Sequence, residues 1–442
     1  MELMTFALTA IWLWLFALGR VKISCACIKA WPLIGIWSLW LLYSLGHCIP
    51  LPPAVVTLLS PHTAAIHLHT GIVAPSQWIP LSLDPYASKV EWMKSLTYIL
   101  IFILCLLLVE SRKRLDILVW VMVCSATFQA VIGAILLFSR MDHTFYIHNP
   151  NALGWASGSF INRNHYANFL VMNLSLGIGL FISRLDFSQE SHSRQGRWLS
   201  IIGVLLSFKA PLRIFLVIMV IGLILSHSRM GNTSFLASLT LAGGISLLSF
   251  RHAGQNNRPL ILFLSSILIM DVLLLGSWFG VDKVVDRLRT TDLATEGRIH
   301  TGKHTLKMIE DFPLTGIGPG AFRSLHPRYK TTDTAGGDFI YEHADNDYLE
   351  IVAEVGLIGF ILLGSPVLLT LRSALKTQNN SSDPLRRGLA FACLMGISAM
   401  MIHTATDYNL HIPANAATFM VLLAIAWIIH PANPADHEQN VR

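Results

Sequence analysis

The sequence predicts an all-α, polytopic integral membrane protein, and three observations support this class. Hydrophobic residues make up 53% of the 442 residues and charged residues only 13%, whereas a soluble domain carries about 25% charge. The mean hydropathy is +0.55. Apolar runs close to the length that a helix needs to cross a bilayer recur along the chain.

These runs predict about eleven spans, and a twelfth is left open. The segment 197–213, RWLSIIGVLLSFKAPLR, is either an interfacial helix or half of a longer span broken by proline. The first run, Met4 to Leu18, lacks a basic region before it and a small-residue cleavage site, so we expect a retained span rather than a signal peptide. The predicted spans cover residues 3–19, 31–47, 94–110, 116–138, 165–184, 213–228, 233–250, 259–279, 348–372, 387–405 and 412–430.

The loops between these spans differ in charge. Most short loops on one side are basic, which predicts that this side is cytoplasmic. The opposite side receives 48–93, 139–164, the 227–232 turn, 406–411 and a long loop from about 280 to 347. That loop holds nine lysines and arginines, which long translocated loops tolerate. We therefore predict one polytopic domain, 1–442, with 280–347 as a large extracytoplasmic helical loop.

The composition argues against nucleic-acid binding and against a framework of zinc sites or disulfides. The formal net charge is +6, but the cations are scattered through short loops, so we expect no nucleic-acid binding. The six cysteines show no zinc-type spacing and no readable disulfide framework. The sequence gives no reason to expect a cofactor.

Three arginines stand out by their positions. Arg163 precedes a span in SGSFINRNHYANFL, Arg229 lies in the outer turn SHSRMGN, and Arg298 lies in the long loop. A guanidinium offers forked donors that match two phosphate oxygens. Several arginines converging at the outer interface would suit a lipid diphosphate. The alternative is that each arginine reaches lipid headgroups or pairs with a nearby acid.

The glycine-rich stretch PLTGIGPG, residues 313–320, lacks the Gly-Lys-Ser/Thr ending of a P-loop. Its backbone amides could face a phosphate, but the pattern favours a plain turn.

An acidic cluster with one histidine precedes the span at 348–372. Asp347 followed by Glu350 resembles a helix-capping pattern, which also accounts for Asn346. Capping does not account for His343 or Asp345. A histidine beside carboxylates is a candidate general base for a hydroxyl near neutral pH.

A divalent metal held by Asp345, Asp347 and Glu350 is the competing interpretation of this cluster. Because no second acidic motif accompanies it, we expect no metal.

Further polar residues carry weaker signals. Asp271 lies inside a span, where pairing with Lys209 or Arg213 is favoured over a proton path. The histidines of PHTAAIHLHT are expected to be solvated. Near the C-terminus, Asp407 lies with Asn409 and His411 in an outer loop, where they either line a cavity or terminate helices.

The chain resembles the O-antigen ligase and polymerase superfamily of bacterial membrane glycosyltransferases. The resembling stretches are IPLSLDPYAS, NRNHYANFL, SRMGN, GRIHTGKHTLKMIEDFPLTGIGPGAF and HADNDYLEIVAEVGLIG. They lie between about residue 50 and residue 415, and the last two are the specific ones.

The resemblance implies a metal-independent, inverting transfer at the periplasmic face of the bacterial inner membrane. The donor would be a glycan on a polyprenyl diphosphate, and the acceptor another glycan, lipid A core or a protein. Arg229 and Arg298 would bind the diphosphate, with Arg163 a weaker candidate. We expect supporting roles for Asn346, Asp347, Tyr348, His165 and Asp407.

One departure from the family pattern affects the catalytic base. Many relatives read His-x-His-Asn, but this chain has Asp345 before Asn346 and keeps only His343. Either residue could be the base, and we favour the two acting as a pair. An aspartate is a weak base unless burial raises its pKa.

A transporter or flippase for an anionic or lipid-linked substrate is the alternative function. Transporters place polar or broken helices near the bilayer midplane, whereas here only Asp271 is central. A purely structural assembly partner is the third class, and it predicts that His343 and Asp345 can be replaced without effect.

Overall fold

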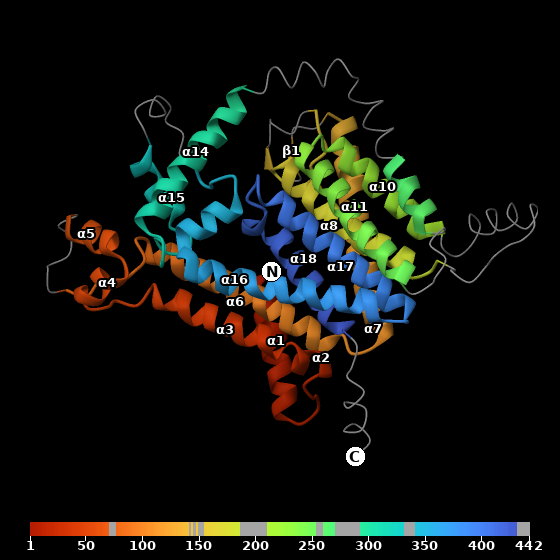
Figure 1. Ribbon diagram of the computed structural model, residues 1–442, viewed down its shortest axis with the longest axis horizontal. Coiled ribbons are helices and arrows are strands. Elements are labelled where there is room, and N and C mark those ends of the chain that lie inside the picture. Colours follow the sequence, from red (N-terminus) through yellow and green to blue (C-terminus); the bar gives the residue numbers. More distant parts are fainter. Residues whose placement is uncertain are drawn as a thin grey trace, which may run out of the picture. The chain divides into compact units, whose positions relative to one another are not determined.

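The computed structural model describes residues 1–69, 77–140, 143–144, 147–148, 154–185, 210–252, 260–269, 292–330 and 341–430. These parts are almost entirely helical (Figure 1). The one sheet within them pairs two two-residue strands, β1 and β2, antiparallel. The elements are α1 (Glu2–Ala17), α2 (Cys25–Lys29), α3 (Trp31–Gly46), α4 (Pro53–Leu59), α5 (Pro61–His69), α6 (Pro85–Leu108), α7 (Arg112–Phe138), β1 (His143–Thr144), β2 (Ile147–His148), α8 (Arg163–Ile182), α10 (Ala210–Leu225), α11 (Arg229–His252), α14 (Asp292–Asp311), α15 (Phe322–Leu325), η2 (His326–Tyr329), α16 (Asp347–Asn380), α17 (Pro384–His403), η3 (Asn409–His411) and α18 (Pro413–Ile428).

The predicted class, an all-α polytopic membrane protein, is confirmed. Five helices are long and apolar enough to cross a membrane: α6, α7, α8, α16 and α17. Five shorter apolar helices accompany them in the described residues, including one at Leu260–Ile269. Every predicted span overlaps one of these helices or α11. The count of eleven or twelve spans stays a prediction, and Lys209 and Asp271 lie outside the described residues.

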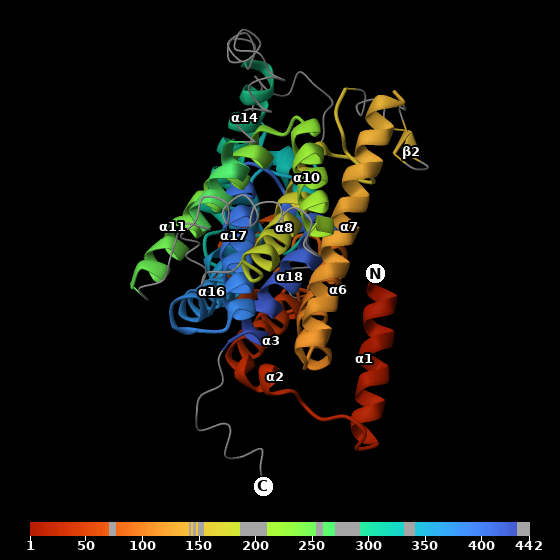
Figure 2. The same ribbon diagram turned by 90° about the vertical axis from the view of Figure 1, so that its right-hand side faces the viewer.

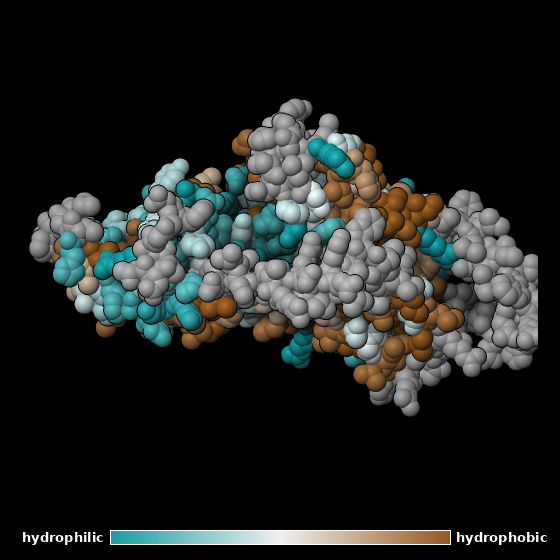
Figure 3. Space-filling view, turned by 90° about the horizontal axis from the view of Figure 1, so that it is seen from above, coloured by the Kyte–Doolittle hydropathy of each residue, from teal (hydrophilic) through white to brown (hydrophobic). Residues whose placement is uncertain are grey.

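Large apolar side chains cover much of the outer surface of these helices, as expected for contact with lipid tails. On α7, Ile117, Val121, Phe128 and Phe138 are all exposed. Figure 3 shows broad apolar areas in brown on the described surface.

The chain divides into two compact units. The first comprises Met1–Leu104, Lys283–Leu369 and Thr404–His411, and the second comprises Cys105–Asp282, Thr370–His403 and Ile412–Arg442. The division of the chain into one membrane domain with an extracytoplasmic 280–347 loop stays a prediction.

Helix α8 forms the centre of the second unit. Its apolar window is entirely buried, and it packs against α7, α10, α11, α17 and α18 (Figure 2). Close packing with α17 depends on two glycines, because a Cβ on Gly179 would lie 2.2 Å from the carbonyl oxygen of Gly388. Small residues permit this kind of backbone approach between membrane helices.

In the first unit, the PLTGIGPG stretch packs against a break in α16. Gly356 has φ 62° and ψ −175°, so the helix is interrupted there. The amide of Ile317 donates to Ala353 O (3.1 Å), and the amide of Gly318 donates to Glu354 O (2.8 Å). These amides are therefore occupied by the chain itself, which supports the turn interpretation over a phosphate site.

Tyr43 of α3 supports the same break, because its hydroxyl donates to Val355 O at 2.8 Å. His47 contacts Thr315 O at 2.8 Å. Hydrogen bonds from Tyr43, His47 and residues 313–318 therefore stabilise the backbone at the break. The break separates the first nine residues of α16, 347–355, from the rest of the helix as a short helix.

Candidate active site

The short helix at the start of α16 is capped by Asn346. Its side-chain Oδ1 accepts hydrogen bonds from the amides of Tyr348 (3.0 Å) and Leu349 (3.2 Å), which is ordinary N-cap chemistry. The sequence interpretation, in which Asp347 and Glu350 also cap the helix, is wrong. Both carboxylates point to histidines instead.

Asp347 attaches the 404–411 segment to the first turn of α16. Its buried carboxylate accepts the amide of Leu410 at 2.9 Å and meets Nδ1 of His411 at 2.9 Å. Its own amide donates to Thr404 O at 3.0 Å. Asp407 is buried in the same segment.

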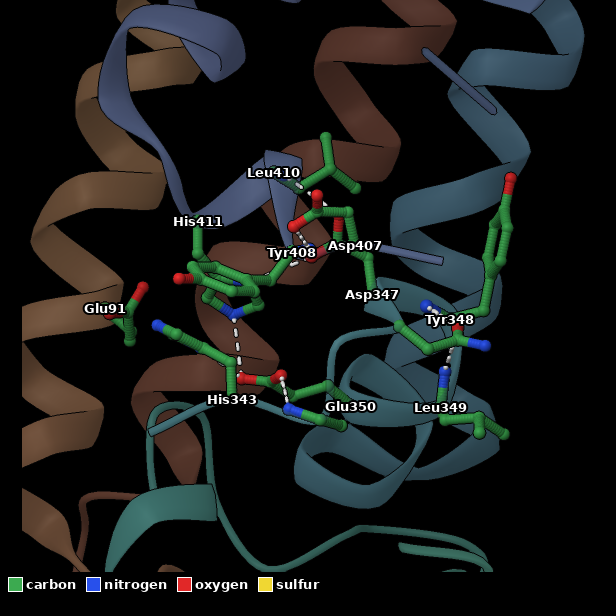
Figure 4. Close-up of polar contacts among 12 residues, drawn as sticks. Glu91, His343, Asp347, Tyr348, Leu349, Glu350, Asp407, Tyr408, Leu410 and His411 are labelled. Atoms are coloured by element: carbon green, nitrogen blue, oxygen red, sulfur yellow. Dashed lines mark hydrogen bonds and ion pairs between the residues drawn. The ribbon is translucent and has the colours of Figure 1, made fainter. Parts of the chain in front are cut away.

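Glu350 lies at the centre of the cluster, buried between two imidazoles (Figure 4). Its Oε1 lies 2.8 Å from Nδ1 of His343 and 3.5 Å from Nε2 of His411. The Oε2 atom accepts the amide of Ala344 at 2.7 Å. Three partners therefore fix this carboxylate in one orientation.

His343 is the more accessible of the two histidines. Its side chain is 27% exposed, whereas the Glu350 side chain is 1% exposed. The ring stacks on Tyr408, with centroids 4.3 Å apart and 19° between planes, and lies 4.7 Å from the His411 ring. With Nδ1 held by Glu350, Nε2 is the ring atom available to exchange a proton.

His411 is the charged member of the cluster. Burial alone would lower its pKa, but the carboxylates of Glu350 and Asp347 outweigh burial and raise that pKa well above its usual value. The imidazolium therefore offsets the charge of two buried carboxylates.

Asp345 faces Arg298 rather than the histidines. Its Oδ2 lies 3.6 Å from Nε of Arg298, and the Arg298 side chain is 47% exposed. The backbone of Asp345 adopts φ 52°. Burial raises the pKa of Asp345, and Arg298 opposes that rise. The first compact unit thus contains His343, Asp345, Asp347, Arg298 and Asp407, and their shared role in one site stays a prediction.

Tyr348 lies beside the cluster, with a side-chain hydrogen bond to Thr404, whereas Arg163 and His165 belong to the second unit. Tyr348 packs its ring against Phe360, with centroids 6.4 Å apart. Arg163 lies over the ring of Trp155, 4.3 Å from its centroid, at the start of α8. His165 follows in that helix and is buried, with its carbonyl accepting from Asn415.

Arg163 and Arg229 are brought near each other within the second unit. Each is the first residue of its helix, α8 or α11. The two helix starts are linked by a 2.8 Å hydrogen bond from the Ser228 hydroxyl to Asn164 Oδ1. The convergence of this pair with Arg298, which lies in the first unit, stays a prediction.

The geometry also bears on metal binding. Among the described residues, one group has ligand atoms close enough to share an ion: His343, Glu350 and His411, all within 4.8 Å of one another. The metal set considered from sequence, Asp345 with Asp347 and Glu350, does not form such a group, because Asp347 is engaged by His411 and Asp345 by Arg298.

Sequence reasoning missed the roles of Glu350 and His411. The sequence offers only weak signals for them: Glu350 fits a capping or metal-binding pattern, and His411 lies in an outer loop where it either lines a cavity or terminates a helix. The contact between Asp347 and His411 joins residues 64 positions apart, and no local pattern encodes it.

The fold and the site define the chain as a multi-pass helical membrane protein with an acid–histidine cluster at the start of a spanning helix. Residues 214–364 match the family model described as O-antigen ligase. This match confirms the resemblance to the O-antigen ligase and polymerase superfamily, and it includes Arg229, Arg298 and His343. The family indicates ligase-like or polymerase-like glycosyltransferase activity on glycan and lipid-linked substrates. A comparison with curated proteins gave no match.

Proposed function

We propose that the protein transfers or polymerises an oligosaccharide from a polyprenyl-diphosphate donor onto an acceptor hydroxyl at the periplasmic face of the bacterial inner membrane. The observation that carries this proposal is the His343–Glu350 pair, 2.8 Å apart, in the unit that also holds the Arg298–Asp345 ion pair. A base and a phosphate-binding cation are the two groups that such a reaction needs.

His343 is the proposed base. Glu350 accepts Nδ1–H of His343, which orients the ring and stabilises the imidazolium that forms when Nε2 takes a proton. In the catalytic triads of hydrolases, a carboxylate likewise orients the histidine and stabilises its imidazolium form. Asp345 has a raised pKa but an arginine partner, so its proposed role is to hold Arg298.

The proposed step is a single displacement. The acceptor oxygen loses its proton to His343 and attacks the anomeric carbon from the face opposite the diphosphate. The bond from that carbon to the diphosphate oxygen breaks, and its electron pair leaves with the diphosphate. Arg298, Arg229 and Arg163 would stabilise this departing charge, an electrostatic contribution that is often the largest in catalysis. The configuration at the anomeric carbon is inverted, and no metal takes part.

The test is reconstitution of the full chain with a polyprenyl-diphosphate glycan and a panel of acceptors: glycan, lipid A core and serine peptides. We expect transfer in the presence of EDTA and its loss in His343→Gln. Transfer that is abolished by EDTA would exclude the metal-independent scheme, and undiminished transfer by His343→Gln would exclude His343 as the base.

A further inference from the structure

The side chains of His343, Glu350 and His411 present three ligand atoms to one small space. Glu350 Oε1 lies 2.8 Å from His343 Nδ1 and 3.5 Å from His411 Nε2. Zinc bonds of about 2.0–2.2 Å to nitrogen and oxygen place neighbouring tetrahedral ligands about 3.3 Å apart. The observed separations lie on either side of that value, so an ion needs only small side-chain shifts.

The second contact of His411 matches what metal-binding histidines require. Its Nδ1 meets the buried carboxylate of Asp347 at 2.9 Å, which turns Nε2 toward Glu350. A ligating histidine almost always donates its other ring N–H to such a carboxylate or carbonyl, which fixes the ring and strengthens the ligand. Figure 4 shows the resulting arrangement of Asp347, His411 and Glu350.

The charges around the cluster favour a dication. Six acidic side chains lie in this part of the first unit, whereas the cationic partners beside them are Lys94 on Glu91, Arg298 on Asp345 and the His411 ring on Asp347. The six are Glu91, Asp345, Asp347, Glu350, Glu354 and, on the 404–411 segment, Asp407. Because the His343 side chain is 27% exposed, an ion has a route of entry.

We propose that His343, Glu350 and His411 form a Zn²⁺ site, with Asp347 as the supporting carboxylate. Two histidines and one glutamate with an open fourth position are a known ligand set for zinc. Bound zinc would occupy Nδ1 of His343 and leave the ring proton on Nε2. That nitrogen then has no lone pair for the acceptor hydroxyl, so zinc inhibits transfer, a consequence that rests on the proposed function.

The experiment is zinc titration of the full-length purified protein by calorimetry, with Co²⁺ as a spectroscopic probe of tetrahedral coordination. We expect one tight site per chain in the wild type. Glu350→Gln and His411→Gln should lose it, and Asp347→Asn should bind about 10- to 100-fold more weakly. The matched control is His62→Gln, since His62 is an exposed histidine that pairs with Asp311 instead.

The site would be overturned by the absence of stoichiometric binding in the wild type, or by binding that survives Glu350→Gln and His411→Gln in protein with unchanged thermal unfolding. A loss of affinity as large in His62→Gln would mean surface binding only and would also overturn it. Zinc that binds without slowing transfer would count against His343 as the base and leave the metal site standing.

Discussion

At the residue scale, Glu350 decides which nitrogen of His343 is open to chemistry. The carboxylate is buried and fixed by three partners, so His343 is held with Nδ1 inward. Asp345, which occupies the position of a second histidine in many relatives, is paired with Arg298 instead. The sequence alone left His343 and Asp345 as equal candidates, because neither partner is adjacent to them in the chain.

Replacing His343 by Gln should lower the transfer rate by about 10²- to 10⁴-fold, the usual contribution of a general base. Glu350→Gln should give a smaller loss, because the ring remains but its imidazolium is less stabilised. Initial rates on reconstituted protein check both. As a control, binding of the lipid donor should be retained in each variant, and a greater loss in Glu350→Gln than in His343→Gln would contradict this order.

His326 predicts a pH dependence of stability. The ring is buried, and neither nitrogen has a hydrogen-bond partner among the described residues. Burial, followed by nearby His304 and Lys330, lowers its pKa from 6.5 to about 4. Between these values the unfolded chain binds the proton more tightly, so stability falls as pH drops from about 6.5 to about 4.

The expected result is a melting temperature that declines across this interval in the wild type and declines less steeply in His326→Phe. Thermal unfolding at fixed ionic strength, with EDTA present, measures both slopes. Identical slopes in the two proteins would contradict a neutral, buried His326.

At the scale of elements, the helices were predictable and their irregularities were not. A long apolar run predicts a helix because the bilayer offers the backbone no hydrogen-bond partners outside the helix itself. Each predicted span overlaps an apolar helix. The break in α16 was not predicted, since Gly356 lies in an otherwise helical apolar run. The turn at 313–320 supplies its hydrogen bonds from a distant stretch of sequence.

Gly356→Ala should destabilise the protein strongly. A Cβ at this position would lie 2.1 Å from Leu314 O, and φ is 62°; such backbone strain alone amounts to about 1–3 kcal/mol. Gly364→Ala is the matched control, because it lies in the same helix with nothing within 4 Å of its Cβ. Thermal unfolding in detergent should show a clear loss for the first variant and none for the second.

At the scale of the whole molecule, the three arginines predicted to bind a diphosphate are divided between the two compact units. Arg298 belongs to the first unit, whereas Arg163 and Arg229 belong to the second and lie near each other at two helix starts. All three arginines were predicted from their positions in outer loops. Which of them lie near each other could not be predicted, because that depends on tertiary contacts such as the hydrogen bond between Ser228 and Asn164.

If both units contribute, Arg229→Ala and Arg298→Ala should each reduce transfer by at least about tenfold, because each removes a charge-assisted contact worth about 1.5–3 kcal/mol. Folding should be unchanged, since both side chains are exposed. Arg328→Ala is the control, an exposed arginine in the same loop as Arg298. Full activity in either variant would remove that arginine from the site.

The break at Gly356 has one further consequence. The orientation of Asp347 and Glu350 is set by hydrogen bonds to residues 313–318 and 404–411, not by the helical rotation of the span that follows. One residue inserted into a continuous helix turns everything beyond it by about 100°. Here we expect an insertion beyond residue 364 to rotate the apolar part of α16 that follows it, while the carboxylates of Asp347 and Glu350 keep their orientation. The membrane-embedded half of α16 can therefore be adapted to bilayers of different thickness without redesigning the catalytic end.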